Sequence, residues 1–415
     1  MMIKRVDGFT LVELMITMTV FVLFIVAASQ VFTGLMTQFK QQSKIAETNI
    51  EGIIGLELLK QDIGHAGYGL PWNLLGVTDA DNDGDFWEHL TNYNEAISAG
   101  SPDPADFNDG NPASALPNPA NIQREPRAVL SGNNVALNSS DYLVIKSVIV
   151  ARNFAAGKWQ PVIYSASGGS SMKIWWSQTN EYVCRNDAGV HYDHVRVIII
   201  SPGATATNRE SLVVSGGKFY TESDDYTALP GFAPSAGDPE HRIMYGVDPD
   251  SNLRVPFNRA DYHIKIPSTN MPRRCASNTG VLYKATLNHA DGGVTELPLL
   301  DCVADMQVIF GLDNDGDGDF EPGIFFPGSP DGYSEDISAF TAQQIRNQVR
   351  QVRVYILAHE GQRDIYYTYP SSTISLGGDV GLGNTFDLAA TIGNPEYKYY
   401  RWKLYTLVVT PNNLR

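Results

Sequence analysis

One long uncharged stretch near the N-terminus constrains this sequence most. Residues 14–39 contain no charged side chain, and as an α-helix they span about 39 Å at 1.5 Å per residue. About 20 such residues suffice to cross a bilayer. Lys4 and Arg5 precede the stretch, and basic residues stay on the cytoplasmic side of a membrane. The sequence therefore predicts one span, with the N-terminus in the cytoplasm and most of the chain outside.

The small residue Gly8 stands before the apolar stretch. An ordinary secretory signal has the opposite order, with a short apolar core followed by a small-residue cleavage site. Cutting after Gly8 removes the basic leader and leaves the apolar helix in the mature protein. This order predicts a helix that keeps a function after processing.

The hexapeptide GFTLVE, residues 8–13, resembles the leader junction of type IV prepilins and type II secretion pseudopilins. The resemblance implies cleavage after Gly8 by prepilin peptidase, N-methylation of Phe9 and an assembly role for Glu13. Independently, a carboxylate inside an apolar helix costs a few kcal/mol on insertion and marks function unless it is paired. We expect the amine of Phe9 on a neighbouring subunit to supply the partner charge.

The sequence predicts an α+β fold in which a long helix packs on an antiparallel sheet. The expected segments are a leader (1–8), a helix (9–65) whose transmembrane part is 9–36, an insertion (66–127) and a β-rich exported domain (128–415). Apolar residues at helical spacing predict the face that packs on the domain: Phe39, Ile45, Ile50, Ile53, Ile54, Leu58 and Ile63.

The insertion, residues 66–127, is rich in Asp, Asn, Gly and Pro. Repeated prolines exclude regular helix and central strands, so it is expected on the surface. The following domain has runs rich in β-branched residues, which predict strands. These runs are residues 142–150, 195–200, 211–214, 306–310, 352–357 and 403–410.

The C-terminal part carries a second resemblance. Residues 296–315, ELPLLDCVADMQVIFGLDND, are similar to a segment of PilW-type minor pilins in which a V-x-D-L-Q-V-x-Y-G pattern enters an Asp-rich turn. Residues 349–358 and the ending YTLVVTPNNLR are similar to that family's closing strands. The resemblance implies a minor pilin of a type IV pilus.

Two acidic clusters contain D-x-D-x-D-G, the start of a calcium loop in which alternate carboxylates converge on the ion. The place of the usual twelfth ligand is taken by Leu90 in the first cluster and Ile324 in the second. Solvated Asn/Asp/Gly turns are the alternative. The candidate ligands are Asp79, Asp81, Asp83 and Asp85, then Asp313, Asp315, Asp317, Asp319 and Glu321.

The chain has three cysteines. In an oxidising periplasm one disulfide and one spare thiol are expected, and Cys275 with Cys302 is the candidate pair. The net charge of −16 opposes binding to nucleic-acid phosphates. No catalytic motif stands in a supporting context, so an enzyme is not expected.

The function that fits these features is a minor pilin at or near the filament tip that primes assembly with other minor pilins. Expected partners are those minor pilins, the major pilin, prepilin peptidase and the inner-membrane assembly platform. The expected location is the bacterial inner membrane, then the filament on the cell surface. The alternatives are a calcium-dependent tip adhesin, which predicts cell adhesion, and a minor pseudopilin of a type II secretion system.

Overall fold

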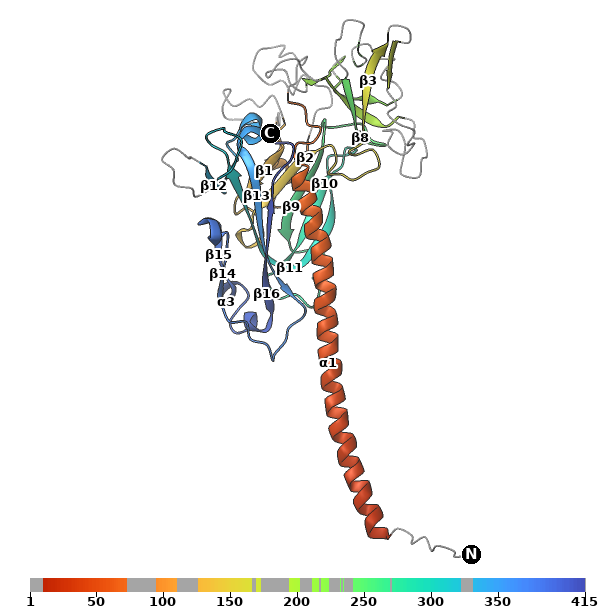
Figure 1. Cartoon of the computed structure of the whole chain (residues 1–415), viewed down its shortest axis with the longest axis vertical. Helices are drawn as coiled ribbons and strands as arrows, with labels where there is room; N and C mark the ends of the chain where they lie inside the picture. The colour runs from red at the N-terminus through yellow and green to blue at the C-terminus, as the bar shows by residue number, and fades with distance from the viewer. Residues whose placement is uncertain are drawn as a thin grey trace, which may run out of the picture.

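The computed structural model describes most of the chain in separate stretches. They are residues 10–72, 95–109, 126–165, 169–172, 194–201, 211–215, 218–223, 232, 234, 242–268, 271–321 and 331–414. A single long helix projects from a β-rich domain (Figure 1). The predicted α+β class is confirmed.

The helix, α1, spans Leu11–Gly64 and has 54 residues. Thr10 caps its start, and Gly67, with φ +82°, turns the chain after its end. A positive φ is readily available only to glycine, so the chain leaves the helix there. The sequence predicted a helix over 9–65. Proline is absent from that range, which removes the residue that most often kinks a helix.

The main sheet is antiparallel, in the order β1-β2-β9-β10-β11-β13-β16, with β12 paired to β11. Its strands are β1 (Val129–Gly132), β2 (Tyr142–Ser147), β9 (Asn258–Lys265), β10 (Gly280–Leu287), β11 (Val294–Leu312), β12 (Gly332–Ser334), β13 (Val349–Glu360) and β16 (Arg401–Val409). The runs predicted at 306–310 and 352–357 lie on β11 and β13. The run at 142–150 is strand only to Ser147, in β2, and the run at 403–410 only to Val409, in β16.

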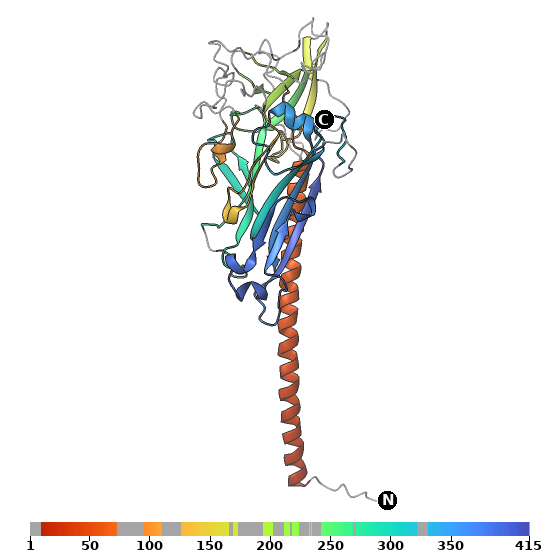
Figure 2. The same ribbon diagram turned by 90° about the vertical axis from the view of Figure 1, so that its left-hand side faces the viewer.

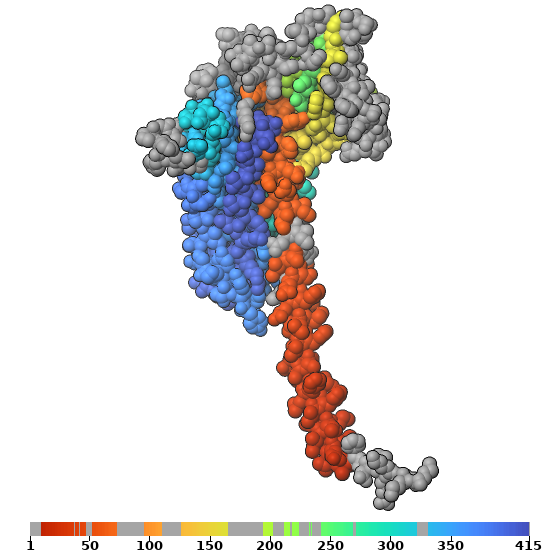
Figure 3. All heavy atoms as spheres, in the orientation of Figure 1, coloured from red at the N-terminus to blue at the C-terminus, as the bar shows by residue number. Residues whose placement is uncertain are grey.

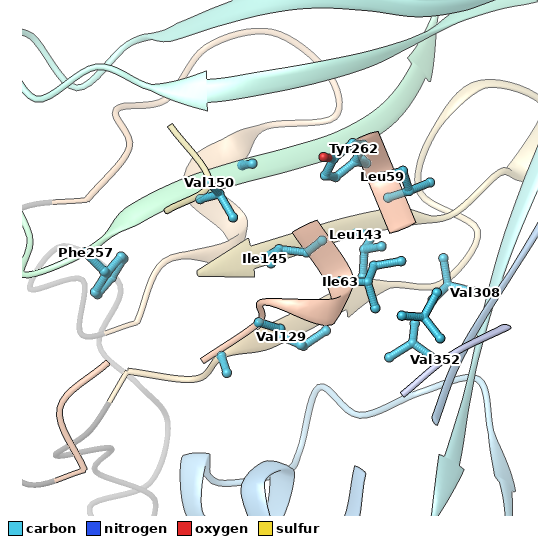
Figure 4. Packing of buried hydrophobic residues seen from close by; sticks show 14 of the residues in the cluster. Leu59, Ile63, Val129, Leu143, Ile145, Val150, Phe257, Tyr262, Val308 and Val352 are labelled. Carbon is cyan, nitrogen blue, oxygen red and sulfur yellow. The ribbon is translucent and has the colours of Figure 1, made fainter. Parts of the chain in front are cut away.

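The C-terminal half of α1 packs on one face of this sheet, in contact with β11, β13 and β16. Leu56, Leu59 and Ile63 join the largest buried cluster, and Figure 4 shows Leu59 and Ile63 among side chains of the sheet. The predicted packing face was wrong at three positions, because Phe39, Ile53 and Ile54 are 67%, 63% and 67% exposed. The side chains of Ile53 and Ile54 lie to one side of the sheet and do not pack on its face.

A small layer covers the opposite face. It contains β14 (Thr373–Leu376), β15 (Asn384–Asp387), α3 (Leu388–Thr391) and η5 (Glu396–Tyr399). Leu376, Phe386 and Leu388 pack there against Tyr355 and Leu357 of β13. Alternate residues of β13 thus serve two cores, as expected for a strand covered on both faces.

A second antiparallel sheet lies at the end of the domain farthest from the helix N-terminus (Figures 1 and 2). Its order is β4-β3-β8-β5-β6, with β7 paired to β5. The strands are β3 (Trp159–Ser165), β4 (Gly169–Met172), β5 (Arg196–Ser201), β6 (Ser211–Leu212), β7 (Thr221–Glu222) and β8 (Arg242–Asp248). The run predicted at 195–200 lies on β5 from Arg196 onward, and the run at 211–214 is strand only at Ser211–Leu212, which is β6. The short elements η1 (Pro104–Phe107), η3 (Leu137–Ser139), α2 (Ala342–Gln348) and η4 (Gly378–Val380) connect the strands.

Part of the expected surface insertion is buried. In residues 95–109 both Glu95 and Asp109 are 2% exposed, and Lys146 of β2 donates hydrogen bonds to both carboxylates. The sequence-based assignment to the surface holds for residues 97–101, which are exposed, but was wrong for Glu95 and Asp109. Buried ion pairs with the sheet replace the contacts with water that these acidic residues normally make.

Candidate functional site

The N-terminal half of α1 presents an apolar surface that no other described part of the chain covers. Every side chain described between residues 10 and 44 is exposed; Phe24, for example, is 70% exposed. Among the described residues one helix, over Leu11–Ala46, is long and apolar enough to cross a membrane. In the space-filling view the N-terminal part of this helix extends away from the domain (Figure 3).

Glu13 lies in the first turn of this helix. Its carboxylate accepts hydrogen bonds from the backbone N–H of Thr10 at 3.0 Å and from the Thr10 hydroxyl at 2.9 Å. The N–H of Glu13 donates back to that hydroxyl at 3.3 Å. This capping box satisfies otherwise unpaired donors and places negative charge at the positive end of the helix dipole. The predicted processing residues Gly8 and Phe9 lie outside the described residues.

The C-terminal half of α1 sits so close to β11 that a side chain larger than glycine would collide. A Cβ atom added to Gly55 would lie 2.4 Å from the carbonyl oxygen of Leu299. Gly34, in the exposed half, has nothing within 4 Å of the same position. Glycine therefore has a packing role in one half of the helix only.

Buried polar contacts also fix the C-terminal half of α1 to the domain. Asp62 of α1 is 2% exposed, and its carboxylate accepts a hydrogen bond from Tyr262 Oη at 2.5 Å and pairs with Arg152 at 3.0 Å. Lys284 of β10 also donates to this carboxylate. Burial lowers the pKa of Lys284, although Asp62 opposes the shift. Breaking such a buried pair leaves a charge without compensation.

The second acidic cluster gathers in one loop after β11. Candidate ligand atoms of Asp313, Asp315 and Asp317 lie within 4.8 Å of one another. Asp313 is buried and accepts hydrogen bonds from the N–H groups of Gly316 at 2.6 Å and Gly318 at 3.0 Å.

Two partners from other parts of the chain hold this loop. Arg350 pairs with Asp313 at 3.0 Å, so part of the negative charge is already balanced. Asp331 accepts from the N–H groups of Asn314 and Glu321, at 3.1 and 3.0 Å. Asp319, the fourth predicted carboxylate of the loop, is exposed. The arrangement offers oxygen ligands, the type that calcium binds. The first predicted cluster, Asp79, Asp81, Asp83 and Asp85, lies outside the described residues.

Cys275 and Cys302 form a disulfide. His359 of β13 lies beside it, and its Nε2 is 2.9 Å from the backbone N of Ala276. Burial lowers the pKa of His359 to about 3, so the ring is neutral near pH 7. The bridge links the segment before β10 to the middle of β11. The third cysteine, Cys184, lies outside the described residues.

Two family models match the chain. Type IV Pilus-assembly protein W, PilW, matches residues 262–413, which run from β9 to just beyond β16. The prokaryotic N-terminal methylation motif matches residues 3–29, which contain Glu13 and the start of α1. The two matches are those of a PilW-type prepilin. No curated protein matches it, and no solved structure does.

The PilW-type prepilin is thus a pilin related to the type IV pilus, and its apolar helix fits a membrane-anchored subunit. Both families comprise structural or assembly components of pili and not enzymes. They imply processing by prepilin peptidase and contact with other pilus components.

Sequence reasoning missed the charged residues buried in the domain of this PilW-type prepilin. Arg259 of β9 pairs with Asp261 at 2.7 Å and with Glu95 at 3.1 Å. Burial would raise the pKa of Asp109, but Lys146 and Arg127 outweigh it and lower that pKa to about 2. A lysine within the apolar run YLVIKS of β2 was the one visible sign, because a central strand rarely contains an unpaired charge.

Proposed function

We propose that this PilW-type prepilin is a minor pilin that acts at or near the filament tip and primes assembly with other minor pilins. The observation that carries the proposal is the apolar half of α1, which is exposed along its length and bears its acid in the first turn. Such a surface needs lipid or other helices around it. The broad domain beyond the helix supports low abundance or a terminal place, because a bulky subunit fits more easily at an end.

Glu13 gives the proposed assembly step its specificity. In the free subunit its carboxylate is held by Thr10 of the same chain. In the filament we propose that the amine of Phe9 on a neighbouring subunit pairs with it. A buried polar pair fixes register between helices, as single polar residues do in coiled coils.

Intact-mass spectrometry of the membrane-extracted protein, from cells with active prepilin peptidase, tests the processing. We expect loss of residues 1–8 and one methyl group on Phe9. A retained leader would contradict the proposal, since the N-terminus would then be only an anchor. Cells without the peptidase supply the matched control.

The proposed orientation places the N-terminus in the cytoplasm and the β-rich domain in the periplasm. Lys4 and Arg5 before the span support it. The proposed partners are other minor pilins, the major pilin and the inner-membrane assembly platform. Deleting the gene separates the two kinds of filament: loss of pili supports the pilus, whereas blocked protein export with normal pili supports a type II secretion pseudopilin.

A second candidate function is calcium-dependent adhesion by the loop after β11. The closeness of Asp313, Asp315 and Asp317 favours it. Neutralising Asp315 and Asp317 together, as Asp→Asn, is expected to remove calcium binding measured by calorimetry, while Arg350 still holds Asp313. Attachment that falls with normal piliation would support adhesion. Absence of any calcium heat from the unaltered protein would eliminate it.

A further inference from the structure

The loop between β13 and β14, residues 361–372, lies at the end of the domain nearest the N-terminus of α1 (Figures 1 and 2). It comes close to the helix there, because a Cβ atom added to Gly361 would lie 2.9 Å from Cγ1 of Ile45. Ile45 belongs to the last turn of the segment Leu11–Ala46, which is long and apolar enough to cross a membrane. The loop therefore lies where the membrane-spanning part of α1 ends.

The tip of this loop exposes two large apolar side chains. Tyr366 is 92% exposed and Ile365 is 57% exposed. Among the described residues outside α1 they are the two most exposed large hydrophobic side chains, and they are neighbours in the sequence. In water this pair forgoes the free energy that burial would give. Adjacent exposed apolar side chains of this kind indicate a surface that binds a partner.

Hydrogen bonds hold the tip in one shape. The buried carboxylate of Asp364 accepts a hydrogen bond from the N–H of Tyr366 at 3.0 Å and pairs with Arg401 of β16 at 2.8 Å. The N–H of Asp364 donates to the carbonyl oxygen of Tyr399 at 2.9 Å. The loop is thus fixed to η5 and to the start of β16. It presents Ile365 and Tyr366 without an entropic cost of ordering when a partner binds.

Basic side chains accompany the tip. Arg363 is exposed, stacks 4.5 Å from the ring centroid of Tyr399 and pairs with Glu396 at 2.8 Å. An ion pair as exposed as this one contributes little to stability, so a phosphate group can take the place of Glu396. Lys40 and Lys44, the first charged residues after the uncharged stretch of α1, are also exposed. Basic residues next to a membrane attract anionic headgroups.

The height of the loop along α1 allows the tip to reach the headgroups. Ile45 stands six residues beyond Phe39, the last uncharged residue, which is about 9 Å at 1.5 Å per residue. The headgroup layer is about 5–8 Å thick on each side of the hydrocarbon core. Ile365 follows Gly361 by four residues, and each residue can extend the chain by about 3.5 Å. The remaining few ångströms are within the reach of the tip.

We propose that the tip, Ile365 and Tyr366 with Arg363 beside them, lies in the headgroup layer of the membrane that α1 spans. Tyrosine is enriched at this level, because its ring is apolar and its hydroxyl group remains hydrated. The Ile365 side chain points to the acyl boundary, and Arg363 pairs with a lipid phosphate. This second contact fixes the tilt of the domain over the membrane. The inference rests on the membrane anchoring in the proposed function and concerns the subunit before it enters a filament.

Photo-crosslinking to lipid tests this contact. The photoreactive amino acid p-benzoylphenylalanine replaces Tyr366 in the full-length protein, which is reconstituted into vesicles of phosphatidylethanolamine and phosphatidylglycerol. In a matched control it replaces Tyr164, an exposed tyrosine of β3 in the sheet farthest from the helix N-terminus. The vesicles are irradiated, and phospholipid adducts are identified by mass spectrometry. We expect an adduct at position 366 and none at position 164.

A charge variant tests the role of Arg363. Arg363→Gln, added to the variant that is photoreactive at position 366, is expected to lower the adduct yield about fivefold, the effect of ~1 kcal/mol for one basic residue at an anionic surface. This loss should vanish in vesicles of phosphatidylcholine alone, which have no net charge. Lys218→Gln, on an exposed lysine between β6 and β7, is the control and should leave the yield unchanged.

The outcomes separate this proposal from the proposed function. A protein that inserts into the vesicles but gives no lipid adduct at position 366 overturns the membrane contact and leaves the pilin function standing. Adducts that join two copies of the chain in place of lipid also overturn it, because the tip would then lie in a protein interface. An unaltered protein that fails to insert into the vesicles overturns the membrane anchoring itself.

Discussion

The two halves of α1 form one continuous helix but are adapted to different surroundings. In the N-terminal half, large apolar side chains such as Phe21 and Phe24 are exposed on all sides. In the C-terminal half Leu59 and Ile63 are buried against the sheet, and Asp62 is paired with basic residues of the domain.

The difference shows that helix-forming tendency says little about what stabilises each half. Most helical stability in proteins comes from packing of one face. The C-terminal half obtains it from its own domain. The N-terminal half has no such packing among the described residues, so lipid or other helices must supply it. Each of the following predictions contrasts the two halves.

The largest effect is expected from Asp62→Ala. It leaves Lys284 buried without its carboxylate, and removing one partner of a buried pair costs about 3–5 kcal/mol. The free energy of unfolding, measured by denaturant titration in detergent, should fall by that amount. Glu57→Ala is the control, because its pair with Lys60 is about half exposed and should change stability by less than about 1 kcal/mol. Equal losses of stability in the two variants would contradict a stabilising role of the buried contacts of Asp62.

The next largest effect is a dependence of stability on pH, which originates in β11 beneath α1. Burial, with the charge of Asp141 added, raises the pKa of Asp305 on β11 from 3.8 to about 7. The folded state then holds a proton that the unfolded chain releases, so stability falls as pH rises between about 4 and 7. Asp305→Asn stays neutral and should be more stable than the unaltered protein at pH 8, by about 2–4 kcal/mol.

Thermal melts at pH 4 and pH 8 measure this effect. At pH 4 the two proteins should agree, because Asp305 is protonated in the folded state. Asp250→Asn, on an exposed carboxylate, is the control and should show no difference at either pH. The apolar half of α1, which has no titrating group between residues 14 and 39, should keep its helical signal throughout.

A smaller effect is expected at the helix glycines. Gly55→Ala places a methyl group against the backbone of Leu299, and overpacking of this kind costs about 1–3 kcal/mol. Gly34→Ala meets nothing and should cost no stability, because alanine favours helix. Denaturant titration measures the free energy of unfolding of both variants. If Gly55→Ala left it unchanged, α1 would not pack tightly on β11.

The smallest effect in free energy, but one with a visible consequence, is expected for Glu13→Ala. Folding and membrane insertion should be unchanged, while incorporation into filaments falls about tenfold, the equivalent of ~1.4 kcal/mol. Quantitative immunoblots of sheared filaments and of membranes measure the two pools. Gln30→Ala, a polar change within the same apolar stretch, is the control. Normal incorporation of Glu13→Ala would refute its assembly role.

The sequence predicted the elements whose residues are apolar in a regular pattern. The long helix and the strands β2, β5, β13 and β16 follow from runs of apolar and β-branched residues. It missed β9, NRADYHIK, because polar residues normally indicate a loop. Here Arg259, Asp261 and His263 are buried on one side of the strand, and contacts far away in sequence offset their burial. Local pattern contains no information on such pairs.

The candidate site divides in the same way. The prepilin junction and the acidic loop are local motifs. The junction was identified by its resemblance to prepilin leaders and the acidic loop by the spacing of its carboxylates. Arg350, which balances Asp313, and Lys284, which holds Asp62, stand far from their partners in sequence. The exposure of Ile53 and Ile54 depends on where the helix meets the sheet, and helical spacing alone could not establish it.

The parallel course of α1 and the strands beneath it has a mechanical consequence (Figures 1 and 2). A pull on the N-terminus acts along the helix axis. The contacts of Leu59, Asp62 and Ile63 then resist sliding together instead of peeling one after another. The interface between α1 and the sheet is therefore loaded in shear, the direction in which it resists force best. Tension passes from α1 directly into the central strands.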